Sequence, residues 1–155
     1  MNIIVAGAGA IGGTVAVLLK EAGYDVSIMC HSSASKAKIE KEGFFLNGVK
    51  TYFKGVCNHH DLGPLGAIAN EAGIRRQVRM LKDMGCNAIR TSHNMPAPEL
   101  VRICDEMGMM LMAETFDCWV TPKVQNGYNL YFEDWAEKDL VNLIRHYRNS
   151  PAVVM

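Results

Sequence analysis

Short apolar segments alternate with longer amphipathic segments along most of this chain. The apolar segments predict buried strands, at residues 2–6, 25–30, 52–57, 87–91, 109–113 and 152–155. Helical spacing of apolar residues, with serine caps and stop glycines, predicts helices at residues 10–22, 33–42, 70–84, 97–107 and 132–148. The segment FFLNG at residues 44–48 contains an Asn-Gly pair, which is typical of a small hairpin or bend. Strands that alternate with helices of this length predict an α/β fold with a mostly parallel sheet.

Length and charge narrow the class of protein. At 155 residues, the chain is long enough to form a single α/β domain over residues 1–155. Its 16 basic and 16 acidic side chains cancel, so charge gives no reason to expect a nucleic acid or an anionic membrane as partner. No apolar run approaches the roughly 20 residues that cross a bilayer. The N-terminus lacks a signal-peptide pattern, and we therefore expect a cytoplasmic protein.

The cysteines show no pattern of a metal site or a disulfide framework. There are 5 of them, an odd number, without a C-x-x-C pair or the spacing of zinc ligands. We expect reduced thiols, mostly buried as small apolar side chains, and no bound metal.

A glycine-rich turn follows the first predicted strand. The run GAGAIG at residues 7–12 fits the pattern G-x-G-x-x-G, with a strand before it and a helix after it. Gly7 allows a tight turn, Gly9 lets the backbone approach a pyrophosphate, and Gly12 lets the helix pack close to the strand. Ala10 and Ile11 lie at the start of the helix, whose free N–H groups attract phosphate. The alternative is an accidental glycine cluster in a tight turn.

The residues after the second predicted strand bear on the choice between NAD and NADP. An Asp or Glu there would hold the ribose 2′-hydroxyl of NAD, but the chain has the sequence CHSS and no acid. Hydroxyls and cations suit a 2′-phosphate, so His31 and Ser32 favour NADP. Alternatively, the serines are simple caps of the following helix.

Residues 1 to about 41 resemble the opening of 2-dehydropantoate 2-reductase (ketopantoate reductase). The segment NIIVAGAGAIGGTVAVLLKEAGYDVSIM carries the resemblance. It implies an NADP-binding loop. The catalytic lysine and acid of that family lie further downstream in regions that cannot be recognised in this chain, so the resemblance implies no catalytic residue.

From about residue 43 onward, the chain resembles a different family. Four segments are similar, in this order, to the start of the (β/α)8 catalytic domain of family 2 glycoside hydrolases of the β-galactosidase type: FFLNGVKTYFKGVCNHHDLGPLG, MLKDMGCNAIRTSHNMP, LVRICDEMGMMLMAETF and NLIRHYRNSPAVVM. In such barrels the loops at the carboxyl ends of the strands hold the ligand. The resemblance implies that His59, His93 and Asn94 occupy sugar-site positions. From the residues alone, each histidine is more often a loop-capping or packing residue.

This second resemblance also implies no catalytic residue within the sequence. Glycoside hydrolysis uses two carboxyl groups, one as acid/base and one as nucleophile. In the family the acid/base glutamate follows the fourth strand, and this sequence stops at Met155, inside that strand. Asp61 and Glu114 lie near the proposed sugar face, but neither matches a catalytic position. We therefore expect no catalytic turnover.

Together, the two resemblances predict a hybrid of two α/β fragments, engineered or recombined; a fused or truncated reading frame is the alternative. Residues 1–42 would supply a Rossmann unit, and residues 43–155 would supply half of a TIM barrel. Joined, they predict a three-layer, doubly wound, Rossmann- or flavodoxin-like sheet of about six strands. Its expected strand order is 2-1-3-4-5-6, in preference to 3-2-1-4-5-6.

In an open sheet of this kind, ligands bind where the strand order reverses, here between the strands at residues 2–6 and 52–57. We therefore expect at most residual NADP or phosphate binding at this crevice, in a monomer or a strand-sharing dimer. The alternatives are a fragment of an NADP-dependent, 2-dehydropantoate reductase-like oxidoreductase and a truncated β-galactosidase-type glycoside hydrolase.

Overall fold

The computed structural model describes residues 2–6, 25–29 and 43–155 of the chain. The predicted helices at residues 10–22 and 33–42 lie outside this part. So do the residues predicted to bind a dinucleotide, which are Gly7, Gly9, Ala10, Ile11, Gly12, His31 and Ser32.

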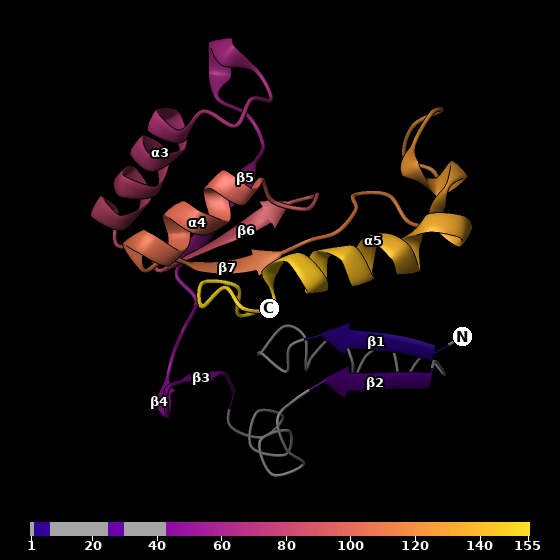
Figure 1. The fold of residues 1–155 in the computed structure, drawn as a ribbon, viewed down its shortest axis with the longest axis horizontal. Helices are drawn as coiled ribbons and strands as arrows, with labels where there is room; N and C mark the ends of the chain where they lie inside the picture. The colour runs from indigo at the N-terminus through magenta and orange to yellow at the C-terminus, as the bar shows by residue number, and fades with distance from the viewer. Residues whose placement is uncertain (1, 7–24, 30–42) are drawn as a thin grey trace. The chain divides into compact units, whose positions relative to one another are not determined.

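The chain divides into two compact units. One contains residues 1–52 and 154–155, and the other contains residues 53–153. Figure 1 shows the elements of both. The predicted single domain, with a seam near residue 42, stays a prediction.

The first unit contains a parallel strand pair. Strand β1 (Asn2–Ala6) lies beside β2 (Asp25–Met29), in register from Asn2 opposite Asp25 to Ala6 opposite Met29. The sequence predicts both strands, and their parallel pairing is the expected start of a Rossmann unit.

The predicted hairpin is confirmed. Strands β3 (Phe45–Leu46) and β4 (Val49–Lys50) pair in antiparallel fashion. The two residues between them, Asn47 and Gly48, have φ angles of 49° and 83°. Two consecutive positive φ angles define the turn that an Asn-Gly pair favours, because neither residue is strongly strained there.

The second unit contains a three-stranded parallel sheet with helices (Figure 1). The strand order is β5-β6-β7, and each neighbouring pair is parallel. The strands are β5 (Gly55–His59), β6 (Ala88–Ser92) and β7 (Met110–Ala113). The helices are α3 (Glu71–Asp83), α4 (Pro98–Met107) and α5 (Phe132–Tyr147), with short 3-10 turns η1 (Gly63–Leu65) and η2 (Tyr128–Leu130). None of the helices in the described ranges is long and apolar enough to span a membrane.

Local signals account for the helix ends. Asn70 caps α3, since its side-chain oxygen accepts a hydrogen bond from the backbone N–H of Gly73 at 2.9 Å. Pro98 begins α4, where its missing N–H costs nothing. Gly108 ends the same helix with a φ of 66°, a conformation that suits glycine.

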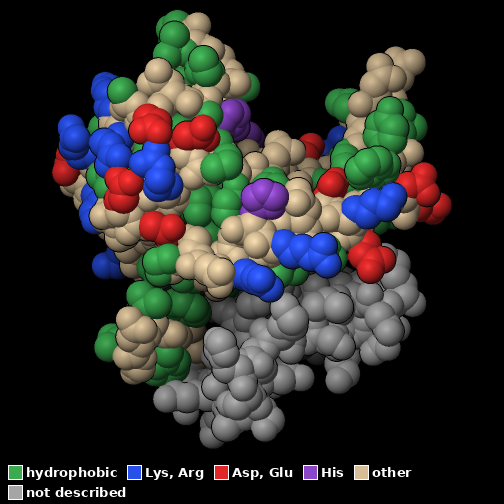
Figure 2. Space-filling view, in the orientation of Figure 1, with side chains coloured by type: hydrophobic (Ala, Val, Ile, Leu, Met, Phe, Trp, Pro, Cys, Tyr) green, Lys and Arg blue, Asp and Glu red, His purple; other side chains and the backbone are tan. Residues whose placement is uncertain are grey.

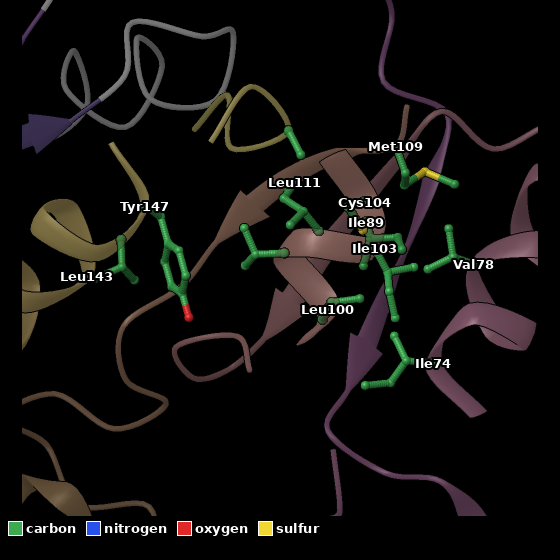
Figure 3. Packing of buried hydrophobic residues seen from close by; sticks show 12 residues of the cluster. Ile74, Val78, Ile89, Leu100, Ile103, Cys104, Met109, Leu111, Leu143 and Tyr147 are labelled. Atoms are coloured by element: carbon green, nitrogen blue, oxygen red, sulfur yellow. The ribbon is translucent and has the colours of Figure 1, made fainter. Parts of the chain in front are cut away.

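The core lies between the sheet and the helices α3 and α4. Ile89 of β6 and Leu111 of β7 are 0% exposed, and so is Ile103 of α4. Ile74 and Val78 of α3 and Leu143 and Tyr147 of α5 belong to the same cluster. Figure 3 shows these side chains converging on one face of the strands.

The position of β5 corrects the sequence prediction. The apolar run predicts a strand at residues 52–57, but β5 covers Gly55–His59. Pairing with β6 sets this register. The backbone N–H of Lys54 donates to Asn87 Oδ1 at 2.7 Å, and the Asn87 N–H donates to the Lys54 carbonyl at 2.7 Å. A Cβ on Gly55 would lie 2.0 Å from the Ala88 carbonyl oxygen, so glycine is needed at this close approach.

The last predicted strand, at residues 152–155, forms a single parallel bridge between Val153 and Leu111. The described strands otherwise fall into three separate sheets, β1-β2, β3-β4 and β5-β6-β7. The α/β class with parallel pairing is therefore observed, and the single six-stranded sheet stays a prediction.

Candidate functional site

The candidate site lies at the carboxyl edge of the β5-β6-β7 sheet. His59 is the last residue of β5 and lies opposite Ser92, the last residue of β6. His93 and Asn94 follow directly, and Glu114 follows β7. Because parallel strands end at the same edge, residues far apart in the sequence meet here.

Glu114 is the centre of the site. Its Oε1 accepts a hydrogen bond from Arg90 Nε at 2.6 Å and lies 2.5 Å from Arg90 Nη2. Its other oxygen, Oε2, lies 2.9 Å from His93 Nδ1. The carboxylate is therefore held from two sides, by a planar guanidinium and by an imidazole.

Two groups lie near His93 Nδ1, namely Glu114 Oε2 at 2.9 Å and Arg90 Nη2 at 3.3 Å. The nearer group is a carboxylate, which can only accept when ionised, so this contact favours the tautomer with the proton on Nδ1. The other nitrogen, Nε2, then carries a lone pair when the ring is neutral. It lies 4.0 Å from Asp117 Oδ1, and the ring of His59 meets that of His93 edge to face at 5.2 Å.

Backbone contacts support the position of Glu114. Its N–H donates to Thr91 Oγ1 at 3.0 Å, and the Thr91 hydroxyl donates to the Asn94 carbonyl at 3.2 Å. Thr91 is buried at 4% exposure. This hydroxyl therefore links the loop after β6 to the end of β7.

Arg90 also contacts a thiol. Its Nη1 donates to Cys57 Sγ at 3.2 Å, across the paired positions of β5 and β6. This hydrogen bond from the guanidinium lowers the pKa of the exposed Cys57 thiol below its ordinary value. The same contact, together with Glu114, raises the pKa of Arg90, which stays charged.

A small pocket adjoins this cluster. Asp61 and Gln77 help to line it from the side of β5 and α3, Ser92 lines it from the end of β6, and Asn94 lines it from the loop that follows. His59 also lines the pocket. The structure thus brings together the three residues that the family resemblance assigns to a sugar site, two of them at the pocket and His93 beside Glu114.

Sequence reasoning did not assign roles to Arg90, Cys57 or Asp117. A signal was present for Arg90, because an arginine in the middle of an otherwise buried strand needs a partner of opposite charge. The partner, Glu114, is 24 residues away in the sequence, and only the pairing of β6 with β7 reveals it.

The cysteines agree in part with the prediction of buried thiols. Within the described residues all four are free, with Cys104 and Cys118 buried, Cys86 half-buried and Cys57 exposed. Cys30 lies outside the described part. In that described part, no group of three or more His, Cys, Asp or Glu side chains is arranged to hold a metal ion.

Two family models match the sequence. The model of the TIM barrel domain of glycosyl hydrolases family 2 matches residues 37–155. Ketopantoate reductase PanE/ApbA matches residues 3–63, so the two matches overlap. Both resemblances seen in the sequence are therefore supported.

Individual relatives of the chain are glycoside hydrolases. The chain is 51% identical over 115 residues to the β-galactosidase BoGH2A of Bacteroides ovatus, covering 74% of this chain and 14% of that protein. A putative β-glucuronidase of Formosa agariphila is 40% identical over 111 residues, which cover 72% of this chain and 11% of that protein.

Solved structures that are similar to this chain also include a glycosidase. A β-glycosidase from Bacteroides vulgatus has a TM-score of 0.69 and 44% identity, over 72% of this chain and 14% of that chain. The chain therefore spans about a seventh or less of the length of these relatives. Since the barrel model matches well over half of its residues, the chain belongs to glycosyl hydrolases family 2, through the TIM barrel domain of that family.

Proposed function

We propose that this chain forms part of the sugar-binding face of a family 2 glycoside hydrolase barrel and binds a β-galactoside at the carboxyl edge of β5-β6-β7. The single observation that carries this proposal is the cluster of Glu114, Arg90 and His93. It offers fixed acceptors and donors at the edge where barrels of this family hold ligands. The 51% identity to a β-galactosidase favours a galactoside over a glucuronide.

The same cluster supports binding without turnover by this chain alone. A retaining glycosidase needs two carboxyl groups about 5–5.5 Å apart, one of them protonated at the start of the reaction. Glu114 is paired with Arg90, and Asp117 is paired with Lys123 at 2.8 Å. The hydrogen bond from Lys123 lowers the pKa of Asp117, which is the wrong direction for a general acid. Asp117 is therefore suited to orient a sugar and unsuited to protonate a leaving group, and Glu114 is held as an acceptor by Arg90 and His93.

The binding proposal is tested by titrating methyl β-galactoside into the 15N-labelled chain and following the imidazole signals. We expect the His93 signals to shift with the sugar concentration, and we expect His93→Ala and Glu114→Gln to abolish binding. His146→Ala is the matched control, because this exposed histidine lies on α5, with its Nδ1 3.2 Å from the Asn142 carbonyl oxygen. Unchanged affinity in His93→Ala and Glu114→Gln would remove the proposal.

Turnover is tested with a chromogenic aryl β-galactoside. We expect no release of the aryl group by the purified chain. We expect release when a fragment that supplies the remaining barrel strands is added. Release by the chain alone, lost in Glu114→Gln, would contradict the account of a binding face without catalysis.

A second candidate function, NADP binding, is favoured by one specific observation. The ketopantoate reductase model matches residues 3–63, which include the glycine-rich run. In this proposal the chain is a hybrid in which Gly7, Gly9 and Gly12 approach the phosphates, with β1 and β5 in one sheet of order 2-1-3-4-5-6. Calorimetry with NADPH to millimolar concentration is the test, with Gly9→Val as the variant. We expect weak binding that the variant removes; no heat from the unmodified chain would eliminate this function.

A further inference from the structure

The thiol of Cys57 lies on the face of the sheet that carries Arg90, and it is open to solvent. Cys57 is exposed, whereas Cys104 and Cys118 are buried and Cys86 is half-buried. Arg90 Nη1 donates to Cys57 Sγ at 3.2 Å, from the position opposite it on β6. Figure 2 shows histidine side chains, in purple, at the surface over the region where β6 ends in Figure 1. Among the cysteines that the structure describes, Cys57 thus joins access from solvent to a cation beside the sulfur.

Ser92 provides an unused hydrogen-bond donor near the same sulfur. Its side chain points to the same face of β6 as that of Arg90, because the two residues are two positions apart in the strand. Ser92 is 4% exposed, and among the described residues its hydroxyl has no hydrogen-bond partner of ordinary geometry. The hydroxyl nevertheless acts on Cys57, since it is the second cause, after Arg90, of the lowered pKa of that thiol. Buried hydroxyls normally have a partner, and an acceptor atom placed on the Cys57 sulfur would supply one.

Arg90 connects this sulfur to the candidate site. While Nη1 donates to Cys57, Nε of the same side chain donates to Glu114 Oε1 at 2.6 Å. Its Nη2 lies 3.3 Å from His93 Nδ1. One planar guanidinium therefore contacts a thiol, a carboxylate and an imidazole. A new atom on the sulfur changes where this guanidinium can lie, and the change reaches Glu114 and His93.

We propose that Cys57 is a site of reversible oxidation by hydrogen peroxide, where Arg90 and Ser92 hold the oxidised sulfur as a sulfenic acid. The oxygen on the sulfur accepts hydrogen bonds from Arg90 Nη1 and from the Ser92 hydroxyl, and the contacts of Arg90 with Glu114 and His93 change. Oxidation of this kind follows thiolate character and access from solvent, and Cys57 has both. The oxidation does not depend on the proposed function; only its effect on a bound galactoside rests on it.

The reaction balances with peroxide as the oxidant and an external thiol as the reductant. The Cys57 thiolate attacks one oxygen of hydrogen peroxide, so that an S–O bond forms while the O–O bond breaks. The hydroxide that leaves takes a proton from solvent and becomes water; the sulfur has lost an electron pair and peroxide has gained it. One external thiol then displaces water from the sulfenic acid and forms a mixed disulfide. A second external thiol releases the Cys57 thiol and leaves with the first as a disulfide.

The test exposes the chain briefly to hydrogen peroxide, traps sulfenic acid with dimedone and locates the adduct by peptide mass spectrometry. We expect the adduct on Cys57 and none on the buried Cys104 and Cys118. It should form faster in the native chain than in urea, where Arg90 and Ser92 no longer lie beside the sulfur. Dithiothreitol added before dimedone should prevent it. Equal rates at Cys57 in the native and the unfolded chain would identify an ordinary exposed thiol and overturn the proposal.

Two variants test whether the neighbours of Cys57 cause this reactivity. Arg90→Gln and Ser92→Ala should each slow adduct formation by about 2- to 10-fold, the effect of one lost hydrogen bond. Cys86→Ala is the matched control, since it removes a half-buried thiol and should leave the rate at Cys57 unchanged. Circular dichroism shows whether each variant folds. If Arg90→Gln does not fold, Ser92→Ala still decides, because it removes only a hydroxyl without a partner among the described residues. An unchanged rate in folded Ser92→Ala would overturn the proposal.

A second measurement follows the connection from the sulfur to the candidate site. In the 15N-labelled chain, the imidazole signals of His93 should shift on oxidation and return with dithiothreitol, and those of His146 on α5 should stay in place. Fixed His93 signals during oxidation of Cys57 would overturn the connection through Arg90. None of these readouts needs a sugar. A chain that is oxidised as described but binds no galactoside would therefore overturn the proposed function and support this inference.

Discussion

Two neighbouring rows of residues cross the β5-β6-β7 sheet, and they differ in chemistry. One row is apolar and consists of Val56, Ile89 and Leu111, which are paired across the three strands. The next row, one residue further along, consists of Cys57, Arg90 and Met112. Since successive side chains of a strand point to opposite faces, the first row packs on helices and the second carries an ionic network.

The two rows differ in how exposed their side chains are and in what those side chains do. Ile89 and Leu111 are 0% exposed, whereas the Arg90 and Glu114 side chains are 37% and 25% exposed. The helix-facing row supplies the core of this unit. The other face keeps charged groups close together at the edge where a ligand can meet them.

The largest effect is expected from the apolar row. Ile89→Ala removes a fully buried side chain between the sheet and α4 and should lower the free energy of unfolding by about 2–5 kcal/mol. Cys57→Ala, in the next row, should lower it far less, because this side chain is exposed. Urea unfolding followed by circular dichroism measures both. Equal losses in the two variants would mean that the rows do not differ as described.

The ionic network of the second row is tested next, through the carboxylate of Glu114, which contacts Arg90. Glu114→Gln keeps the shape but removes the charge that Arg90 and His93 face. It should cost about 1.5–3 kcal/mol, the contribution of hydrogen bonds to charged groups. Glu106→Gln is the control, because Glu106 also bonds two arginines but its side chain is 42% exposed. The control should cost clearly less than Glu114→Gln, and a control loss as large as that of Glu114→Gln would contradict this ranking.

Thiol reactivity compares Cys57, in the second row, with Cys104 in the core, and it does so without a stability measurement. The pKa of Cys57 is lowered by Arg90, whereas burial raises the pKa of Cys104 to about 12. A lowered pKa gives more thiolate at neutral pH, so iodoacetamide should alkylate Cys57 well before Cys104. In Arg90→Gln, the pH at which Cys57 reacts at half its maximal rate should rise. A pH profile that does not move would show that Arg90 does not act on the thiol.

The smallest effect is expected at the rim of the site. Lys123→Ala removes the cation that lowers the pKa of Asp117, so the pKa of this carboxyl should rise toward its ordinary value. Both side chains are exposed, and stability should change little. A carboxyl-carbon NMR titration follows Asp117 directly. A pKa that stays low in the variant would identify a cation other than Lys123 as its cause.

Much of the second unit follows from local signals in the sequence. The helix at residues 70–84 is observed as Glu71–Asp83, since Asn70 is a cap and Gly85 follows the last turn. The helix at residues 97–107 is observed as Pro98–Met107 for the same kind of reason. Local propensity and capping decide these elements, and both can be read along the chain.

The rest depends on contacts between distant residues. Tyr52 and Phe53 look like strand residues, yet pairing with Ala88 starts β5 at Gly55. Glu114 looks like an unassigned acid until its bonds to Arg90 and His93 are seen. Apolar spacing carries no information on which strand lies beside which, or on which charges meet across them. The family resemblance identified His59, His93 and Asn94 as sugar-site positions. It gave no role to Glu114, the carboxylate that contacts His93.

The central claim is that a galactoside binds at the cluster of Glu114, Arg90 and His93. A crystal structure of the chain with bound methyl β-galactoside tests it most directly. The account predicts sugar hydroxyls within about 3 Å of His93 Nε2 and of a Glu114 oxygen, with the sugar at the carboxyl edge of β5-β6-β7. A sugar bound elsewhere on the chain, with this edge unchanged, would contradict the claim.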